Sequence, residues 1–195
     1  MASYGQSVKY ESRLVGGPCE GCEAVFEYGT QVLGPTDTLP GYHGGGTKIK
    51  VTGTIYLPDG VTPAEGVILY IYHTNQKGEY AKRGGETGWA TRHGYIRGCI
   101  KTKKDGTYTF YTIKPGRYPG RSTAAHIHPT ILERNGNYYW VEEFLFKGDS
   151  FLTKKEISKD APRGGSTGLL DLAKEGDLWI GKRDFILGKN IPGYE

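Results

Sequence analysis

The fold is decided by the stretch Lys48-Ile49-Lys50-Val51-Thr52-Gly53-Thr54-Ile55-Tyr56, in which polar and apolar residues alternate. Alternation with period two is typical of a strand with one face buried and the other in water. The next apolar run, Val67-Ile68-Leu69-Tyr70-Ile71-Tyr72, is continuous and rich in β-branched and aromatic residues. Such a run predicts a strand that is buried on both faces.

Further segments of strand character follow, separated by turn residues. Asp105-Gly106 lies between the alternating runs 94–102 and 107–113, and Asp-Gly in that setting predicts a β-hairpin. Helical periodicity is limited to a turn or two over Leu169 to Lys174. Three more segments are expected to form strands: 124–132, 137–146 and 177–187. The expected fold is all-β, an antiparallel β-sandwich with long loops and little helix.

The length of 195 residues fits one domain that can bury a core of useful size. Residues 1–46 are rich in glycine, proline and polar residues and end in Gly44-Gly45-Gly46. We therefore expect an N-terminal arm or extension over residues 1–46 and a folded β-sandwich domain over 47–195. The arm leaves both a homo-oligomer and a monomer with the arm folded back open.

Composition excludes several classes of function. The formal net charge of +4 is spread along the chain, so the sequence predicts no nucleic-acid partner. No apolar run is long enough for a membrane span, and the first residues lack the apolar core of a signal peptide. We expect a soluble chain, cytoplasmic by default, or secreted or periplasmic if a leader was trimmed.

The cysteines Cys19, Cys22 and Cys99 cannot form a disulfide framework. Cys19-Glu20-Gly21-Cys22 lies in a glycine-rich segment without the second ligand pair of a zinc site or the helix of a thioredoxin-like motif. A structural role is favoured, either as free thiols or as a tight local disulfide.

Two tyrosines and two histidines are the candidate metal ligands. His126 and His128 are two residues apart, so on a strand both imidazoles project from one face. Tyr118 lies in a loop that its prolines restrict, and Tyr80 follows the buried strand and a glycine turn. Two phenolates with two imidazoles favour a mononuclear non-haem Fe(III) ion and leave room for an added ligand.

The sequence resembles the intradiol ring-cleavage dioxygenases, in particular the protocatechuate 3,4-dioxygenase branch. The resemblance covers about residues 47 to 150, with its motifs in the family order. It rests on these matches: Tyr72, Gly78-Glu79-Tyr80, Arg97-Gly98, Thr102, Asp105-Gly106-Thr107-Tyr108-Thr109-Phe110, Thr112-Ile113-Lys114-Pro115-Gly116, Tyr118-Pro119 and Ala125-His126-Ile127-His128.

The resemblance implies an oxidoreductase that cleaves a catechol between its two hydroxyl-bearing carbons with O2, giving a cis,cis-muconate-type product. It implies Tyr80 and His126 as equatorial ligands, and Tyr118 and His128 as axial ones. Tyr118 would leave the metal and accept a substrate proton. No nicotinamide, flavin or haem is implied.

Other residues are candidates for the substrate site. Tyr72 matches a family aromatic that lines the pocket, and Arg121 matches an arginine near the catalytic centre. The chain departs from the family at Thr123, where an arginine is common, and at Glu143, which corresponds to a glutamine. A buried carboxylate there would disfavour an anionic substrate unless Arg97, Arg121 or protonation neutralises it. The expected substrate is therefore a neutral or larger catechol rather than protocatechuate.

Two other classes stay open at this stage. A noncatalytic transthyretin-like or carbohydrate-binding β-sandwich would share the strand pattern but would not need the tyrosines and histidines together. A hydrolytic or copper enzyme would use His126 and His128 with a third ligand. His73 and His93 are interpreted as hydrogen-bonded structural histidines.

Overall fold

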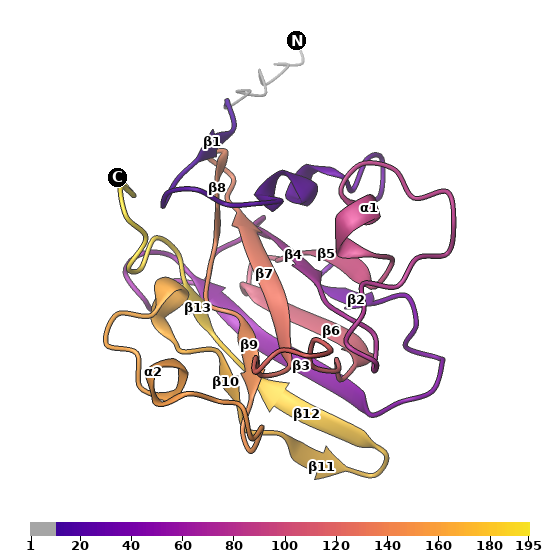
Figure 1. Ribbon diagram of the computed structural model, residues 1–195. Helices are drawn as coiled ribbons and strands as arrows, with labels where there is room; N and C mark the ends of the chain where they lie inside the picture. The colour runs from indigo at the N-terminus through magenta and orange to yellow at the C-terminus, as the bar shows by residue number, and fades with distance from the viewer. Residues whose placement is uncertain (1–10) are drawn as a thin grey trace.

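Two β-sheets form the body of the molecule in the computed structural model, which describes residues 11–195 (Figure 1). The first sheet has the order β1-β8-β7-β4-β5, with β9 pairing β7 and β10 pairing β9. Its strands are β1 (Arg13–Leu14), β4 (Ile68–Tyr72), β5 (Arg97–Lys101), β7 (His126–Leu132), β8 (Asn137–Trp140), β9 (Phe144–Phe146) and β10 (Leu169–Leu170).

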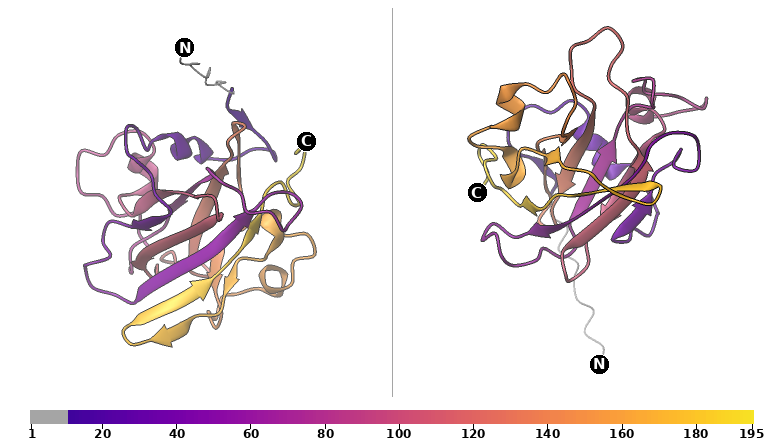
Figure 2. Two further views of the ribbon diagram at one scale, coloured as in Figure 1. Left: turned by 180° about the vertical axis from the view of Figure 1, so that it is seen from behind. Right: turned by 90° about the horizontal axis from the view of Figure 1, so that it is seen from below.

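The second sheet has the order β11-β12-β3-β6-β2, with β13 also pairing β3. Its strands are β2 (Thr36–Thr38), β3 (Lys48–Tyr56), β6 (Thr107–Ile113), β11 (Ala173–Glu175), β12 (Leu178–Lys182) and β13 (Phe185–Ile186). Short helical segments complete the described part of the chain: η1 (Cys22–Phe26), α1 (Ala90–His93), α2 (Lys154–Ile157) and η2 (Arg163–Gly165). Figure 2 shows the layers from behind and from below.

The predicted all-β sandwich with little helix is confirmed, and its sheets are mixed. Antiparallel pairs dominate the centre, where β4 lies between β5 and β7 and where β3 pairs β6. Parallel pairs are added when distant segments join, as β12 does along β3 and β2 along β6.

The alternating stretch forms β3 with strictly alternating burial, and Ile49, Val51 and Ile55 enter the core between the sheets. Gly53 also faces inward, where a Cβ would stand 1.7 Å from the carbonyl oxygen of Arg183. No larger residue fits there without moving the backbone of Arg183, which runs alongside β3 between β12 and β13.

The continuous apolar run forms β4, and its burial on both faces has a clear cause. Leu69 and Ile71 enter the core between the sheets. Ile68 and Tyr70 point to the other side, where they pack with Ala24 and Val25 of η1. The segment before β3 therefore covers the outer face of the first sheet.

The prediction of a hairpin at Asp105-Gly106 is wrong. The turn exists, with Gly106 N donating to Lys103 O at 2.9 Å, but β5 pairs β4 and β6 pairs β3, so the turn crosses from one sheet to the other. The helical turn expected over Leu169 to Lys174 is also wrong, because this segment contributes to β10 and β11.

Candidate metal centre

Four side chains from three segments converge on one point. Tyr80 lies on the loop after β4, Tyr118 on the loop between β6 and β7, and His126 and His128 on β7. Tyr80 Oη lies 2.5 Å from Tyr118 Oη and 3.0 Å from His128 Nε2. Tyr118 Oη lies 3.2 Å from His128 Nε2 and 3.1 Å from His126 Nε2. The two Nε2 atoms are 3.0 Å apart.

The two tyrosine loops are locked against each other. Gly78 has φ +79°, and a Cβ there would stand 1.7 Å from the carbonyl oxygen of Arg117. Gly116 N donates to Asn75 O at 2.9 Å, and Thr74 Oγ1 donates to Gly116 O at 2.8 Å. Only glycine permits this close approach, which holds the two phenols at a fixed separation.

Both histidines present an unprotonated nitrogen to the cluster. His126 Nδ1 donates to the carbonyl oxygen of Ala124 at 2.7 Å, and His128 Nδ1 lies 3.1 Å from Glu143 Oε1. With each Nδ1 carrying its proton, each Nε2 is left with a lone pair. Two lone pairs facing each other at 3.0 Å repel unless a cation lies between them.

The donor set fits a metal ion. Metal bonds of about 2.1 Å at nearly right angles separate neighbouring donor atoms by about 3 Å, which is close to the five separations of 2.5 to 3.2 Å. Burial raises the pKa of the Tyr80 and Tyr118 phenols and lowers the pKa of His126. The imidazole is therefore neutral and ready to bind, and the phenols need a strongly charged cation to ionise them.

Tyr72 stacks on the ring of His128 and restricts its orientation. The β4–β7 register places it directly opposite His128, and the two rings stack with centroids 4.6 Å apart. The ring of His93 stacks with Tyr72 at 3.7 Å, and its Nδ1 shares a hydrogen bond of 2.8 Å with Tyr70 Oη. An aromatic stack thus supports the cluster from the side of β4.

Hollows in the surface reach the cluster from several directions. One of about 390 Å³ is lined by Tyr72, His128 and Glu143, and a second of about 310 Å³ is lined by Tyr72 and Tyr80. A third, of about 660 Å³, lies beside Tyr118 and Arg121. A small planar molecule can therefore approach the donor atoms from solvent.

The other predicted site residues lie at different distances from the cluster. The guanidinium of Arg121 lies 5.7 Å from the centroid of the Tyr118 ring, and Glu143 contacts His128. Thr123 is half-buried on the loop into β7, three residues before His126. Burial raises the pKa of Glu143, but its hydrogen bond with His128 and nearby positive charges hold that pKa below its ordinary value.

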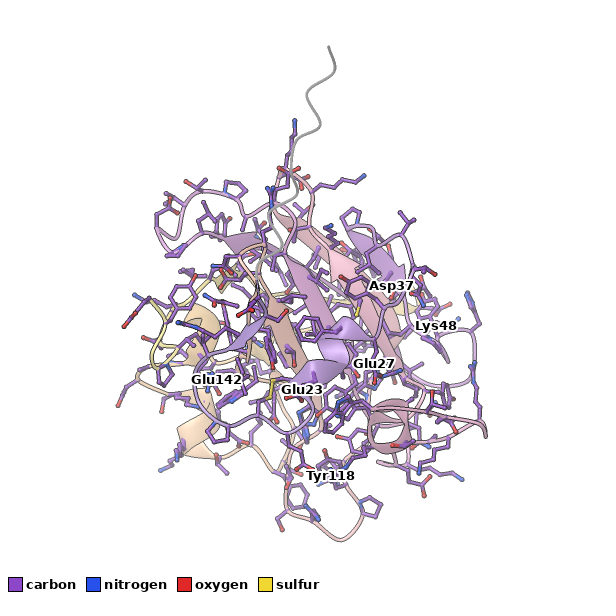
Figure 3. The ribbon with its side chains drawn as sticks, turned by 90° about the horizontal axis from the view of Figure 1, so that it is seen from above. Glu23, Glu27, Asp37, Lys48, Tyr118 and Glu142 are labelled. Atoms are coloured by element: carbon purple, nitrogen blue, oxygen red, sulfur yellow. A yellow bond between two sulfur atoms is a disulfide. The ribbon has the colours of Figure 1, made fainter. Side chains whose placement is uncertain are left out.

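Arg97 is not brought to the cluster. Its Nη1 lies 2.6 Å from Glu27 Oε2, and Glu27 Oε1 also accepts from the backbone N of Trp89. Figure 3 shows Glu27, the residue that follows η1, and Tyr118 on a separate loop. Arg97 therefore joins the N-terminal segment to β5 and does not neutralise Glu143.

Sequence reasoning missed the contribution of the N-terminal segment to the hollows. Cys19 and Cys22 form a disulfide, and Glu20 between them lines the two hollows beside Tyr72, together with Trp140 in one and Trp89 in the other. The tight local disulfide was one of the two structural roles expected from the cysteine spacing, but nothing in the sequence indicated where the closed loop packs.

Known proteins share both the sequence and the fold of this chain. The family model described as Dioxygenase matches residues 34–164. The protocatechuate 3,4-dioxygenase beta chain of Burkholderia cepacia is 30% identical over 180 residues, which cover 82% of this chain and 75% of that protein.

Two solved structures show the same architecture. The dioxygenase domain of a dioxygenase carbohydrate-binding protein fusion from Streptomyces sp. SirexAA-E superposes with TM-score 0.59 at 25% identity, covering 82% of this chain and 92% of that one. An intradiol ring-cleavage dioxygenase from Tetranychus urticae superposes with TM-score 0.55 at 17% identity, covering 91% and 94%, and shows the fold alone. With the family match and the 30% identical relative, the chain belongs to the intradiol ring-cleavage dioxygenases, which are oxidoreductases.

Proposed function

We propose that the chain binds a mononuclear non-haem Fe(III) ion through Tyr80, Tyr118, His126 and His128, and cleaves a catechol between its two hydroxyl-bearing carbons with O2. The product is a cis,cis-muconate-type diacid. The observation that carries the proposal is the convergence of two phenols and two imidazoles within 2.5 to 3.2 Å. A core packed for stability alone would pair these polar atoms with complementary partners.

The ion, when bound, supplies Lewis-acid and redox chemistry toward a chelated catechol and O2. Tyr118 is the residue of the chain that takes up a substrate proton, at its Oη. Its loop lies at the mouth of a hollow, and the cation of Arg121 lies 5.7 Å from its ring centroid. The positive charge of Arg121 is attracted to the electron-rich ring of Tyr118. Tyr72 presents its ring beside His128, where it can line one side of a planar substrate.

The substrate class follows from the charges in the hollow beside His128. Glu20 and Glu143 line it, and Thr123 supplies no charge where the family commonly has an arginine. A carboxylate on the catechol ring would be repelled by these groups. We propose a neutral or larger catechol as the substrate.

We also propose that residues 47–195 form the catalytic unit and that the preceding segment is its cover. The first ten residues of that segment lie outside the described part of the chain. Its later part packs η1 on β4 and places the Cys19–Cys22 loop at the hollow. Among residues 11–195 no helix is long and apolar enough to cross a membrane.

Iron content and the visible spectrum of the purified protein, before and after anaerobic addition of catechol, test the proposal. We expect nearly one iron per chain and a broad tyrosinate-to-iron(III) absorption that shifts to longer wavelength with catechol. Admission of O2 should then consume one equivalent and release the ring-opened diacid. The Tyr80→Phe variant should lose iron or most of the absorption, because it lacks one of the two phenolates.

A colourless protein that stays colourless after iron reconstitution contradicts the proposal and favours a noncatalytic β-sandwich module. Tight binding of zinc or copper with unchanged affinity in Tyr80→Phe would instead favour a site built on His126 and His128 alone.

A further inference from the structure

Glu143 lies next to His128 at a position that the register of β7 and β9 predicts. β9 pairs β7 antiparallel, with His126 opposite Leu145 and Ile127 opposite Phe144. Continuing this register by one residue places Glu143 opposite His128. Side chains at opposite positions of neighbouring strands lie on the same face and within contact distance. Glu143 is the residue immediately before β9, and its contact with His128 is consistent with this register.

The carboxylate binds the side of the imidazole that faces away from the cluster. Glu143 Oε1 lies 3.1 Å from His128 Nδ1, whereas Nε2 of the same ring faces Tyr80, Tyr118 and His126. His126, His128 and Glu143 form a group whose candidate ligand atoms lie within 4.8 Å of one another, but Glu143 contacts Nδ1 of His128 and not the Nε2 atom that converges with the phenols.

We propose that Glu143 is a positioning residue for the metal centre: it accepts the Nδ1–H of His128, fixes the tautomer that leaves Nε2 free, and makes this imidazole a stronger donor. The inference rests on the proposed iron site and extends it to a residue that does not touch the ion. Carboxylate partners of this kind orient metal-binding histidines and raise their basicity, and their removal typically costs about 10- to 100-fold in metal affinity or activity.

The partners of the two histidines set the expected electronic effect. His126 donates to a neutral carbonyl, that of Ala124, whereas His128 donates to a carboxylate. Charge-assisted hydrogen bonds are roughly twice as strong as neutral ones. An amide at position 143 would keep the geometry and remove the charge, and alanine would remove both.

Long-range ¹H–¹⁵N spectra of the metal-free, histidine-labelled full chain test the orientation directly. We expect His128 to be protonated at Nδ1 in the wild type and in Glu143→Gln, and to move toward the Nε2–H tautomer in Glu143→Ala. An unchanged tautomer in Glu143→Ala would overturn the proposed orientation. So would protonation at Nε2 in the wild type.

Iron retention against a competing chelator tests the consequence for the ion. We expect Glu143→Gln to retain iron up to about tenfold less well than the wild type and Glu143→Ala about 10- to 100-fold less well. The tyrosinate-to-iron absorption of Glu143→Gln should lie at longer wavelength, because weaker donation from His128 leaves the ion more electron-poor. Equal retention and an unmoved absorption in both variants would overturn the proposal.

Glu142→Gln is the matched control. Glu142 Oε1 accepts from Lys159 Nζ at 2.6 Å and from the backbone N of Arg163 at 3.1 Å, and an amide oxygen can keep both contacts. Figure 3 shows Glu142 apart from Tyr118. This variant removes the same charge from the neighbouring residue and should retain iron within twofold of the wild type.

The failure of this inference differs from the failure of the proposed function. If the wild type takes up no iron, the iron site is wrong, and the tautomer measurement still decides whether Glu143 orients His128. If Glu143→Ala loses iron as completely as a ligand variant and Glu143→Gln rescues none of it, Glu143 is itself a ligand and the positioning role is wrong.

Discussion

The histidine in the core between the sheets and the two histidines at the start of β7 differ in how their ring nitrogens are paired. His73 is fully enclosed, yet its Nδ1 lies 2.7 Å from Thr74 O and its Nε2 lies 2.7 Å from Thr112 Oγ1. His126 and His128 have partners at Nδ1 but turn their Nε2 atoms toward each other at 3.0 Å. Complete pairing is what stability favours, so the unmatched lone pairs at β7 support the metal site that we propose there.

Two other buried polar residues, Glu133 and Arg183, have partners as His73 does. Glu133 accepts from the hydroxyls of Tyr139 and Tyr194 at 2.6 and 3.0 Å, and Arg183 donates to Ser166 and to the carbonyl of Glu142. The cluster at β7 has two phenols and two imidazoles with too few protons to pair them all. Folding places these groups together at a cost in stability that the proposed metal ion would offset.

Removal of one converging nitrogen should give the largest effect. We expect His126→Gln to lose nearly all of its iron and to lower kcat/KM for catechol about a thousandfold or more, because the ion and its several kcal/mol of charge stabilisation are lost. Without metal, the free energy of unfolding of this variant should equal or exceed that of the metal-free wild type. The measurements are iron per chain, oxygen uptake and denaturant unfolding.

The exposed His43 provides the control, since His43→Gln removes an imidazole without touching the cluster. Normal turnover in His126→Gln would contradict the assignment of this residue to the metal centre.

The enclosed histidine should control stability in acid. Burial lowers the pKa of His73 from 6.5 to about 4, so the unfolded chain binds more protons than the folded one between these values. The contribution of the neutral His73 to the free energy of unfolding is therefore fully present above about pH 6.5. It is lost as the pH falls toward 4, by roughly 1.4 kcal/mol per pH unit or about 3 kcal/mol in all. The pKa of His93 is lowered to about 4 mainly by burial, so this histidine also makes the free energy of unfolding fall as the pH is lowered.

His73→Gln can keep both hydrogen bonds without titrating. The difference in unfolding free energy between this variant and the wild type should shrink or reverse between pH 6.5 and 4. Parallel pH profiles for the two proteins would show that His73 is not neutral in the fold.

Local patterns predicted the parts of the molecule that local physics decides. The alternation over 48–56 required one buried face, and β3 has it. The spacing of His126 and His128 placed both imidazoles on one face of a strand, and β7 brings their Nε2 atoms together. Pleat and periodicity alone determine these features.

Pairings between distant segments could not be predicted in the same way. Asp105-Gly106 forms its turn, but the turn energy does not decide whether the flanking strands pair with each other or with β4 and β3. The contact of Glu143 with His128 depends on the return of β9 to β7, and the approach of Glu20 depends on η1 packing over β4. Each requires knowledge of which surfaces are left uncovered by the rest of the chain.

Substitution of two glycines by alanine should distinguish the effect of strain in the core from the effect of strain at the proposed metal site. Gly53→Ala should lower the free energy of unfolding by about 1 to 3 kcal/mol, because the new methyl group displaces the Arg183 carbonyl that accepts from Tyr108 Oη. Its iron retention should stay normal. Gly78→Ala should instead weaken iron retention, since the methyl group separates the Tyr80 and Tyr118 loops.

Gly84→Ala is the control for backbone strain. Gly84 also has positive φ, at +93°, but a Cβ there meets nothing within 4 Å. If Gly84→Ala weakens iron retention as much as Gly78→Ala, loop strain and not the separation of the phenols is responsible.

The smallest effect we expect is in substrate choice, where long-range charge acts without a direct contact. Glu20 and Glu143 should favour catechol over its 4-carboxylate by about tenfold in kcat/KM, which corresponds to about 1.4 kcal/mol. Glu20→Gln should narrow this ratio by less than Glu143→Gln does, because the Glu20 side chain is 70% exposed and pairs with Arg92, so solvent screens its charge. Raising the ionic strength should narrow the ratio in the wild type as well. A preference for the carboxylated ring, or a ratio that neither variant changes, would show that Arg121 and the loop around Tyr118 dominate the potential, and that the unpaired cluster at β7 is selective for the metal ion but not for the charge of the substrate.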